Sequence, residues 1–170
     1  MKSRGISLIE ILVVIAIMAV LASIAIPGLS SYIKKYSIEK EVTMLFSDIS
    51  EQRLKSMEKG DSYGILFNSN REYLLVKFLD SNYNLKVDSD EELIPIKRVD
   101  LKYPLSKKGG NLEGTIILFD NRGIARTANW GLGGITIFIN YPARINCIIA
   151  SPTSIKLGKW DENTSECKPR

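Results

Sequence analysis

One carboxylate, Glu10, lies in an apolar N-terminal stretch where a charge needs a physical reason. From Ile11 to Pro27 no residue is charged, and Ser23 carries the only polar side chain. A carboxylate at such a depth in a membrane costs on the order of a few kcal/mol unless it reaches water or pairs with a cation. Glu10 therefore either marks the hydrated N-terminal end of a helix, where the dipole favours negative charge, or pairs with a cation.

The element that positions Glu10 is predicted to be a transmembrane helix. At about 1.5 Å per residue, a helix over residues 6–26 is about 30 Å long, which is the thickness of the hydrocarbon core of a bilayer. The alternative is an ordinary secretory signal, cut after the small residues of Ser23–Ala25, which would release a soluble protein beginning near Ile26. The apolar run is long for the core of such a signal, and Glu10 would interrupt it.

The residues around Glu10 resemble the class III signal of type IV prepilins and type II secretion pseudopilins. Lys2 and Arg4 precede Gly5, one apolar residue follows, and Ser7–Glu10 leads into the uncharged run. The main departure is Ile6, because those proteins usually carry Phe at this position. The basic leader also favours a cytoplasmic N-terminus.

This resemblance implies that residues 1–5 are a leader, removed by a prepilin peptidase that cuts between Gly5 and Ile6 and methylates the new amino terminus. Glu10 would then pair with the amino terminus of a neighbouring subunit during filament assembly. The implied location is the bacterial inner membrane, crossed once by residues 6–28, with the head in the periplasm. The implied partners are other pilins or pseudopilins, the peptidase, an inner-membrane assembly platform, and membrane lipid before assembly.

Beyond the apolar run, spacings of three and four residues predict that the helix continues to about Glu58, with Gly60 as its stop. Pro27 removes one backbone hydrogen bond and is expected to kink the axis, and it matches the position of the usual helix-breaking proline of type IV pilins. Residues 29–59 form the amphipathic half, which we expect to pack against the head. Its predicted apolar face consists of Leu29, Tyr32, Ile33, Tyr36, Val42, Leu45, Ile49, Leu54 and Met57.

From Ser62 the hydrophobic period changes to two, which predicts a β-rich globular head over residues 60–170. The fold class is therefore α+β, with a long kinked helix packed on an antiparallel sheet, as in pilins. The predicted loop is 80–92 and the predicted turns are 68–70, 121–123 and 158–160. The predicted strands are 63–67, 73–79, 93–99, 101–103, 115–120, 124–130, 135–141, 145–150 and 154–157.

The order of these strands resembles the head of minor pseudopilins of the H type (GspH) and of FimT/FimU-like minor pilins. One strand ends at Phe119–Asp120, a turn follows at Asn121–Gly123, a later strand holds Cys147, and the last turns at Gly158. The resemblance implies a minor pilin or pseudopilin, a structural subunit that helps to initiate or tip a type IV pilus or a type II secretion pseudopilus.

The two cysteines, Cys147 and Cys167, are too far apart for a CxxC redox pair. If the head lies in the oxidising periplasm, a disulfide between them is the simplest interpretation, and the alternative is two unpaired buried thiols. A bridge that closes about twenty residues would stabilise the fold by about 3 kcal/mol and hold a polar C-terminal tail in place.

Enzymatic functions are disfavoured by composition and spacing. The chain has no histidine, which excludes His-dependent catalytic triads and most zinc sites. No spacing joins a nucleophile to its base, and no glycine-rich phosphate loop precedes a helix. The acidic stretch with Asp88, Asp90, Glu91 and Glu92 lacks the regular spacing of a calcium loop, so we expect a solvated loop. We therefore predict no catalytic residue, metal site or cofactor.

The alternative function is DNA binding within a DNA-uptake pilus. Basic residues gather in the second half of the chain, and phosphate contacts need little more than cations on one face. DNA-uptake members of the family carry a Gly-Arg-x-Arg element, whereas this chain has Gly158 followed by Lys159, a tryptophan and Asp161. An acid at the second basic position weakens the match. The candidate DNA contacts are Arg144, Lys156 and Lys159.

Overall fold

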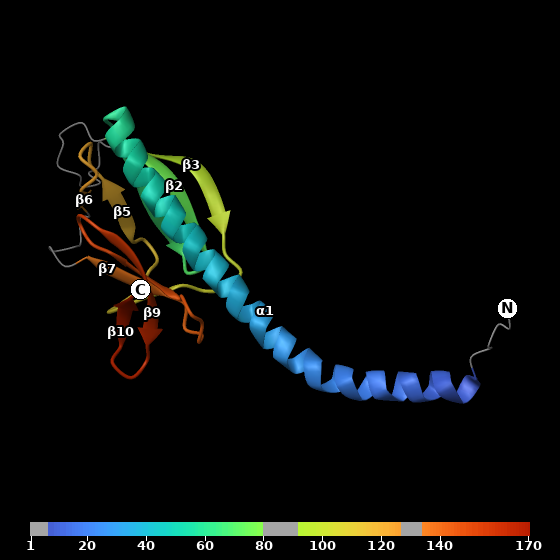
Figure 1. Ribbon diagram of the computed structural model, residues 1–170. Coiled ribbons are helices and arrows are strands. Elements are labelled where there is room, and N and C mark those ends of the chain that lie inside the picture. The colour runs from blue at the N-terminus through green and yellow to red at the C-terminus, as the bar shows by residue number, and fades with distance from the viewer. Residues whose placement is uncertain (1–6, 80–91, 127–133) are drawn as a thin grey trace.

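The computed structural model describes residues 7–79, 92–126 and 134–170, apart from the side chains of residues 25–27. One long helix, α1 (Leu8–Lys59), leads into a head built from ten described strands. The N-terminal part of α1 projects away from the head, and its C-terminal part lies along it (Figure 1). This arrangement is the predicted α+β fold.

Helix α1 is 52 residues long and ends at Gly60, whose φ of 73° is the left-handed conformation that favours glycine. The N–H of Gly60 donates to the carbonyl of Ser56 at 3.0 Å, which confirms the predicted stop. The parts Leu8–Ile24 and Gly28–Lys59 meet at a bend of 41°. Among the described residues no single straight helix is long and apolar enough to cross a membrane, and the bent pair passes this test by length and composition only.

The face of α1 that packs on the head has a seven-residue repeat. Ile38, Val42, Leu45 and Ile49 are at most 1% exposed, and the same face continues through Gln52 and Ser56, both fully buried. The prediction was right for Val42, Leu45 and Ile49. It was wrong for the other six residues, which are 44–67% exposed: Leu29, Tyr32, Ile33, Tyr36, Leu54 and Met57. The first buried side chain among the described residues of the helix is Ile38, and after Ile49 the buried positions are polar.

The head contains two antiparallel five-stranded sheets rather than one. The first has the order β3 (Glu92–Asp100), β2 (Glu72–Leu79), β1 (Ser62–Ser69), β5 (Ile116–Phe119) and β6 (Ala125–Arg126). The second has the order β10 (Glu166–Pro169), β9 (Ile155–Asp161), β8 (Cys147–Ala150), β7 (Ile135–Phe138) and β4 (Ser106–Lys107). The predicted hairpin corresponds to β1 and β2.

Helix α1 packs against β1 and β5 of the first sheet and against β8 and β9 of the second. A single buried cluster joins the helix and both sheets, with Phe67, Tyr73, Phe119, Ile137 and Ile148 among its members. The helix therefore holds the two sheets together over one core.

The pairing of β1 with β5 requires a glycine at position 64. A Cβ at Gly64 would lie 2.0 Å from the carbonyl oxygen of Ile117 in β5.

One predicted strand and one predicted turn were wrong. Residues 101–103 are not a strand, because the N–H groups of Lys102 and Tyr103 donate to the carboxylate of Glu41 on α1 (2.8 and 3.1 Å) instead of to a neighbouring strand. The expected turn at Gly158 is also absent, since β9 continues to Asp161. A Cβ at Gly158 would lie 2.6 Å from the Sγ of Cys167, so this glycine serves close packing within a strand.

The chain after β9 forms a further strand, β10, where only a polar tail was expected. It pairs antiparallel with β9 from Glu166 opposite Asp161 to Pro169 opposite Gly158. Of the remaining predictions, most of the loop 80–92, including Asp88, Asp90 and Glu91, and the end of the predicted strand 124–130 lie outside the described residues.

Candidate functional site

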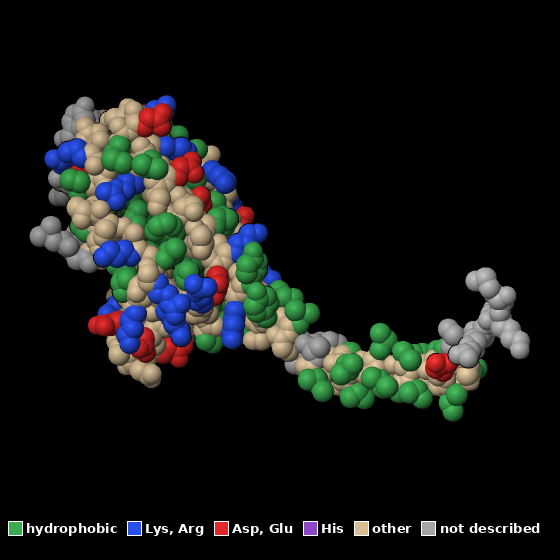
Figure 2. Space-filling view, viewed as in Figure 1, with side chains coloured by type: hydrophobic (Ala, Val, Ile, Leu, Met, Phe, Trp, Pro, Cys, Tyr) green, Lys and Arg blue, Asp and Glu red, His purple; other side chains and the backbone are tan. Residues whose placement is uncertain are grey.

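Glu10 lies in the first turn of α1, where its N–H donates to the carbonyl of Ser7 at 3.0 Å. The side chain is exposed, and within the described part of the chain it forms no ion pair. Every large apolar side chain from Leu8 to Ile24 is at least half exposed, because this part of the helix has no contact with the head (Figure 2). The structure thus presents one carboxylate near the end of an apolar rod that a single chain leaves uncovered.

Polar contacts fix the other half of α1 to the head. Besides Glu41, whose carboxylate accepts two backbone N–H groups, Glu39 accepts the N–H of Arg144 at 2.8 Å. The ammonium of Lys34 lies 3.9 Å from the centre of the Tyr141 ring, a cation–π contact. These three helix residues bind two loops of the head, Glu41 the loop after β3 and Glu39 and Lys34 the loop before β8. They therefore determine how the apolar rod is oriented relative to it.

A buried hydrogen bond adds to this joint, since the hydroxyl of Tyr73 on β2 donates to Asp48 of α1 at 2.5 Å. Tyr73 is fully buried and Asp48 is 9% exposed. Burial raises the pKa of the Tyr73 hydroxyl well above its usual range, and the hydrogen bond to Asp48 raises it further. The phenol is therefore neutral and serves as a permanent donor to the helix.

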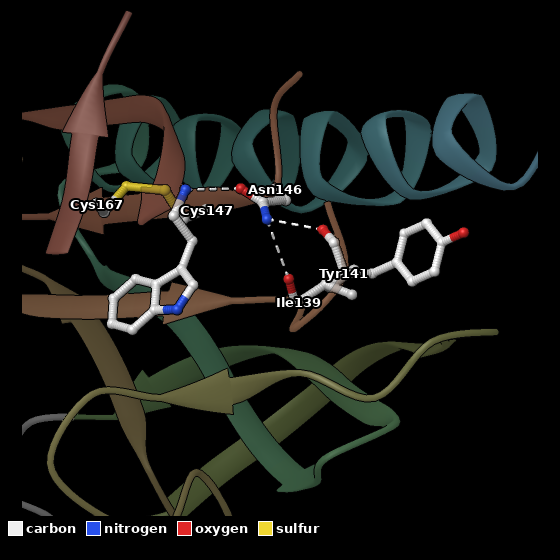
Figure 3. Close-up of a disulfide and its surroundings, with 6 residues drawn as sticks. Ile139, Tyr141, Asn146, Cys147 and Cys167 are labelled. Carbon is white, nitrogen blue, oxygen red and sulfur yellow. Dashed lines mark hydrogen bonds between the residues drawn. A yellow bond between two sulfur atoms is a disulfide. The ribbon is translucent and has the colours of Figure 1, made fainter. Parts of the chain in front are cut away.

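The predicted disulfide between Cys147 and Cys167 is present and joins β8 to β10 across β9 (Figure 3). The neighbouring Asn146 is 3% exposed, and its amide donates to the carbonyls of Ile139 (3.3 Å) and Tyr141 (2.9 Å). Its Oδ1 accepts the N–H of Trp160 at 2.7 Å. The bridge connects β8 to β10, and this asparagine connects the loop before β8 to β9.

Of the three candidate DNA contacts, the structure brings two together. Arg144 and Lys159 line a groove of about 430 Å³ between α1 on one side and the loop before β8, strand β9 and the residue after β10 on the other. Lys156 is exposed on the opposite face of β9 from Lys159, because side chains alternate along a strand. Asp161 is engaged by the ammonium of Lys168 at 2.6 Å. The remaining residues that line the groove are Tyr32, Lys35, Tyr36, Glu39, Pro142, Ala143 and Arg170.

The sequence interpretation missed the contribution of the helix to this groove. Tyr32 and Tyr36 were assigned to the face packed on the head, whereas in the structure they line this groove with Lys35. The available signal was the spacing of an aromatic, a lysine and an aromatic at positions 32, 35 and 36, directly after the apolar run. Among the described residues, no group of three or more Cys, Asp or Glu side chains is placed to hold a metal ion.

Comparisons with known proteins bear on both parts of the chain. Residues 1–26 match the family model of the prokaryotic N-terminal methylation motif. The fold matches the structure of the minor pseudopilin EpsH from the type 2 secretion system of Vibrio cholerae, with a TM-score of 0.50 and 10% sequence identity over 72% of this chain and 97% of that chain. No curated protein sequence gives a significant match. The signal and the fold confirm the predicted resemblance to type IV pilin-like proteins.

Proposed function

We propose that this protein is a minor pilin or pseudopilin, a structural subunit of a filament anchored in the inner membrane. The observation that carries the proposal is the uncovered N-terminal half of α1, an apolar rod with one carboxylate in its first turn. The match of residues 1–26 to the methylation motif supports it independently. The likeness of the fold to EpsH favours a minor subunit of the H type. The subunit performs no bond chemistry.

Assembly energetics explain why this arrangement suits a filament subunit. While the rod lies in lipid, bringing rods together gives no large hydrophobic gain, so packing and charge neutralisation must supply specificity. After cleavage at Gly5, the amino group of Ile6 is a fixed cation close to Glu10 of a neighbour. A carboxylate away from water is costly alone and tolerated beside an ammonium. Glu10 therefore sets the axial register between subunits.

The topology follows from the same features. The leader stays in the cytoplasm, residues 6–28 cross the inner membrane, and the head lies in the periplasm. The disulfide fits an oxidising compartment. Pro27 lies in the segment between Ile24 and Gly28 where the two parts of α1 change direction, and we attribute the bend to it.

The test is the mature N-terminus together with one substitution. Mass spectrometry of the protein from its native membrane should give N-methyl-Ile6 as the first residue, whereas a terminus near Ile26 would overturn the proposal. Glu10→Leu should reach the membrane as well as the wild type. Its amount in the sheared filament fraction should fall by roughly tenfold or more, because the neighbour's ammonium loses its partner. Glu10→Asp, which keeps the charge, should recover part of the assembly.

A DNA-binding minor pilin of a DNA-uptake pilus is the second candidate. The observation in its favour is that Arg144 and Lys159 line one groove with Lys35 and Arg170. A duplex is bound by a row of cations along its backbone. Lys156, the third predicted contact, does not line this groove. This placement favours a single phosphate group over a track for a duplex.

A further inference from the structure

The groove described above, which we call the foot groove, is lined by Tyr32, Lys35, Tyr36, Glu39, Pro142, Ala143, Arg144, Lys159 and Arg170. Its four cations come from distant parts of the chain: one from α1, one from the loop before β8, one from β9 and one from after β10. Among the described residues of the lining, Glu39 is the only acidic side chain, and it keeps its negative charge while its carboxylate accepts the backbone N–H of Arg144. With four cations and one carboxylate, the side chains of the groove carry a net charge of +3.

The position of the foot groove along the chain indicates which anion it meets. Tyr32 to Tyr36 follow Gly28, where the second part of α1 begins, by about 6 to 12 Å along the helix axis. The headgroup layer of a bilayer is about 5 to 8 Å thick on each side of the hydrocarbon core. If the apolar rod spans the membrane, these residues lie within that layer or at its outer edge.

The side chains at this level have the chemistry of a membrane interface. Tyr32, Ile33 and Tyr36 are 67%, 55% and 63% exposed and continue the apolar surface of the rod. Tyrosine is enriched at this depth because its ring is apolar and its hydroxyl is polar. Figure 2 shows Lys and Arg side chains, with Asp and Glu side chains among them, at the lower end of the head, beside exposed hydrophobic side chains of the helix. Hydrocarbon and phosphate would thus meet matching surfaces side by side.

We propose that the foot groove binds the phosphate of an anionic phospholipid headgroup in the leaflet that faces the head. This inference rests on the membrane anchorage in the proposed function. Lys35, Arg144, Lys159 and Arg170 surround the phosphate, and the rings of Tyr32 and Tyr36 lie beside them at the level of the headgroups. The lipid holds the head at a fixed tilt on the membrane before the subunit enters a filament.

The experiment uses the full chain in nanodiscs of phosphatidylcholine alone or of phosphatidylcholine with phosphatidylglycerol in equal parts. Native mass spectrometry counts the lipids that stay bound to the released protein. The test variant is Arg144→Gln with Lys159→Gln. The control is Lys108→Gln with Lys156→Gln, which removes the same charge from exposed positions outside the groove.

The wild type should retain phosphatidylglycerol in preference to phosphatidylcholine. The test variant should lose this preference by roughly tenfold to thirtyfold, since each cation near an anionic surface contributes about fivefold in affinity. The control should behave as the wild type. An equal loss in the control, or no preference in the wild type, overturns the inference.

Two further outcomes separate this inference from the other proposals. Salt-sensitive retention of duplex DNA that the test variant abolishes, without any lipid preference, would assign the groove to nucleic acid and overturn the lipid site. Insertion into neutral nanodiscs tests the anchorage itself. A wild type that inserts but shows no lipid preference refutes only the lipid site, whereas one that does not insert counts against the proposed function.

Discussion

At the scale of single residues, Asp120 shows how one carboxylate organises a turn between two strands. Asp120 is 7% exposed, and its Oδ1 accepts the N–H groups of Arg122 and Ile124, both at 2.9 Å. Its Oδ2 accepts Nε (3.2 Å) and Nη2 (3.0 Å) of the Arg122 guanidinium. Gly123 closes the turn with a φ of 72°. The predicted turn at 121–123 is thus held by the residue before it.

The Asp120 carboxylate should make the stability of the head depend on pH. Burial disfavours the charge, but the N–H of Ile124 and the Arg122 guanidinium outweigh it and hold the pKa of Asp120 below its usual range. A carboxyl whose folded pKa is depressed stabilises the fold above its unfolded pKa, near 4, and this contribution is lost as pH falls toward the folded pKa. Asp120→Asn should therefore lower the unfolding free energy at pH 7 and flatten its dependence on pH below about 4.

Urea unfolding of the full chain in detergent at a series of pH values measures this effect. Asp100→Asn is the matched control, because the Asp100 side chain is 73% exposed and pairs only with Arg98 among the described residues. The control should keep the wild-type slope. An unchanged slope in Asp120→Asn would show that other carboxyls dominate the acid transition.

At the scale of elements, the disulfide decides whether β10 belongs to the second sheet. Strand β10 has four residues, lies at the edge of its sheet and pairs only with β9. Replacing Cys147 and Cys167 by alanine should lower the unfolding free energy by about 3 kcal/mol, because the unfolded chain regains the freedom of a loop of about twenty residues. In this variant, the increase in amide hydrogen exchange over the wild type should be largest in β10 and in the half of β9 that pairs with it.

Thermal unfolding with and without a reducing agent provides the check on the disulfide. The reduced wild type should unfold at the temperature of the Cys147→Ala, Cys167→Ala variant. The variant itself should be insensitive to reduction. Equal stability of the oxidised wild type and the variant would contradict the prediction.

The sequence predicted elements whose pattern is local. The spacing of Val42, Leu45 and Ile49 indicates the buried face of α1, and alternation around an Asn-rich turn indicates the hairpin of β1 and β2. The bridge between Cys147 and Cys167 followed from the cysteine count and an assumed compartment. These features depend on neighbours in the chain or on composition, so they could be read without a structure.

Features that depend on distant partners were missed. Residues 101–103 leave the strand pattern because of Glu41, which lies sixty residues earlier in the sequence. Gly158 looks like a turn residue, and only its contact with Cys167 explains a glycine inside β9. The foot groove combines four segments, so its residues appear as unrelated surface cations in the sequence. The face beyond Ile49 was misjudged because Gln52 and Ser56 are polar and yet fully buried.

At the scale of the whole molecule, the chain consists of a rod and a head that meet along one half of α1 (Figure 1). The core begins at Ile38, and the described residues before Gly28 make no packing contribution to it. We therefore expect a chain that starts at Gly28 to fold without the rod. Its thermal midpoint should lie within a few degrees of that of the full chain in detergent, and its disulfide should form.

Circular dichroism and gel filtration of this truncated protein measure the outcome. Its matched comparison is a chain that starts at Glu41, which lacks Ile38 of the core and Glu39 of the helix–head joint and should be clearly less stable. A truncated protein from Gly28 that aggregates or loses its cooperative transition would show that the rod supports the head after all.

The 41° bend of α1 has a mechanical consequence. If α1 were straight, rotation about its axis would turn the head without displacing it. Because the helix is bent, rotation of Leu8–Ile24 about its own axis moves Gly28–Lys59 along the surface of a cone. Glu39, Glu41 and Asp48 attach the head to this second part, so the same rotation displaces the whole head sideways and changes the face that it presents to its surroundings.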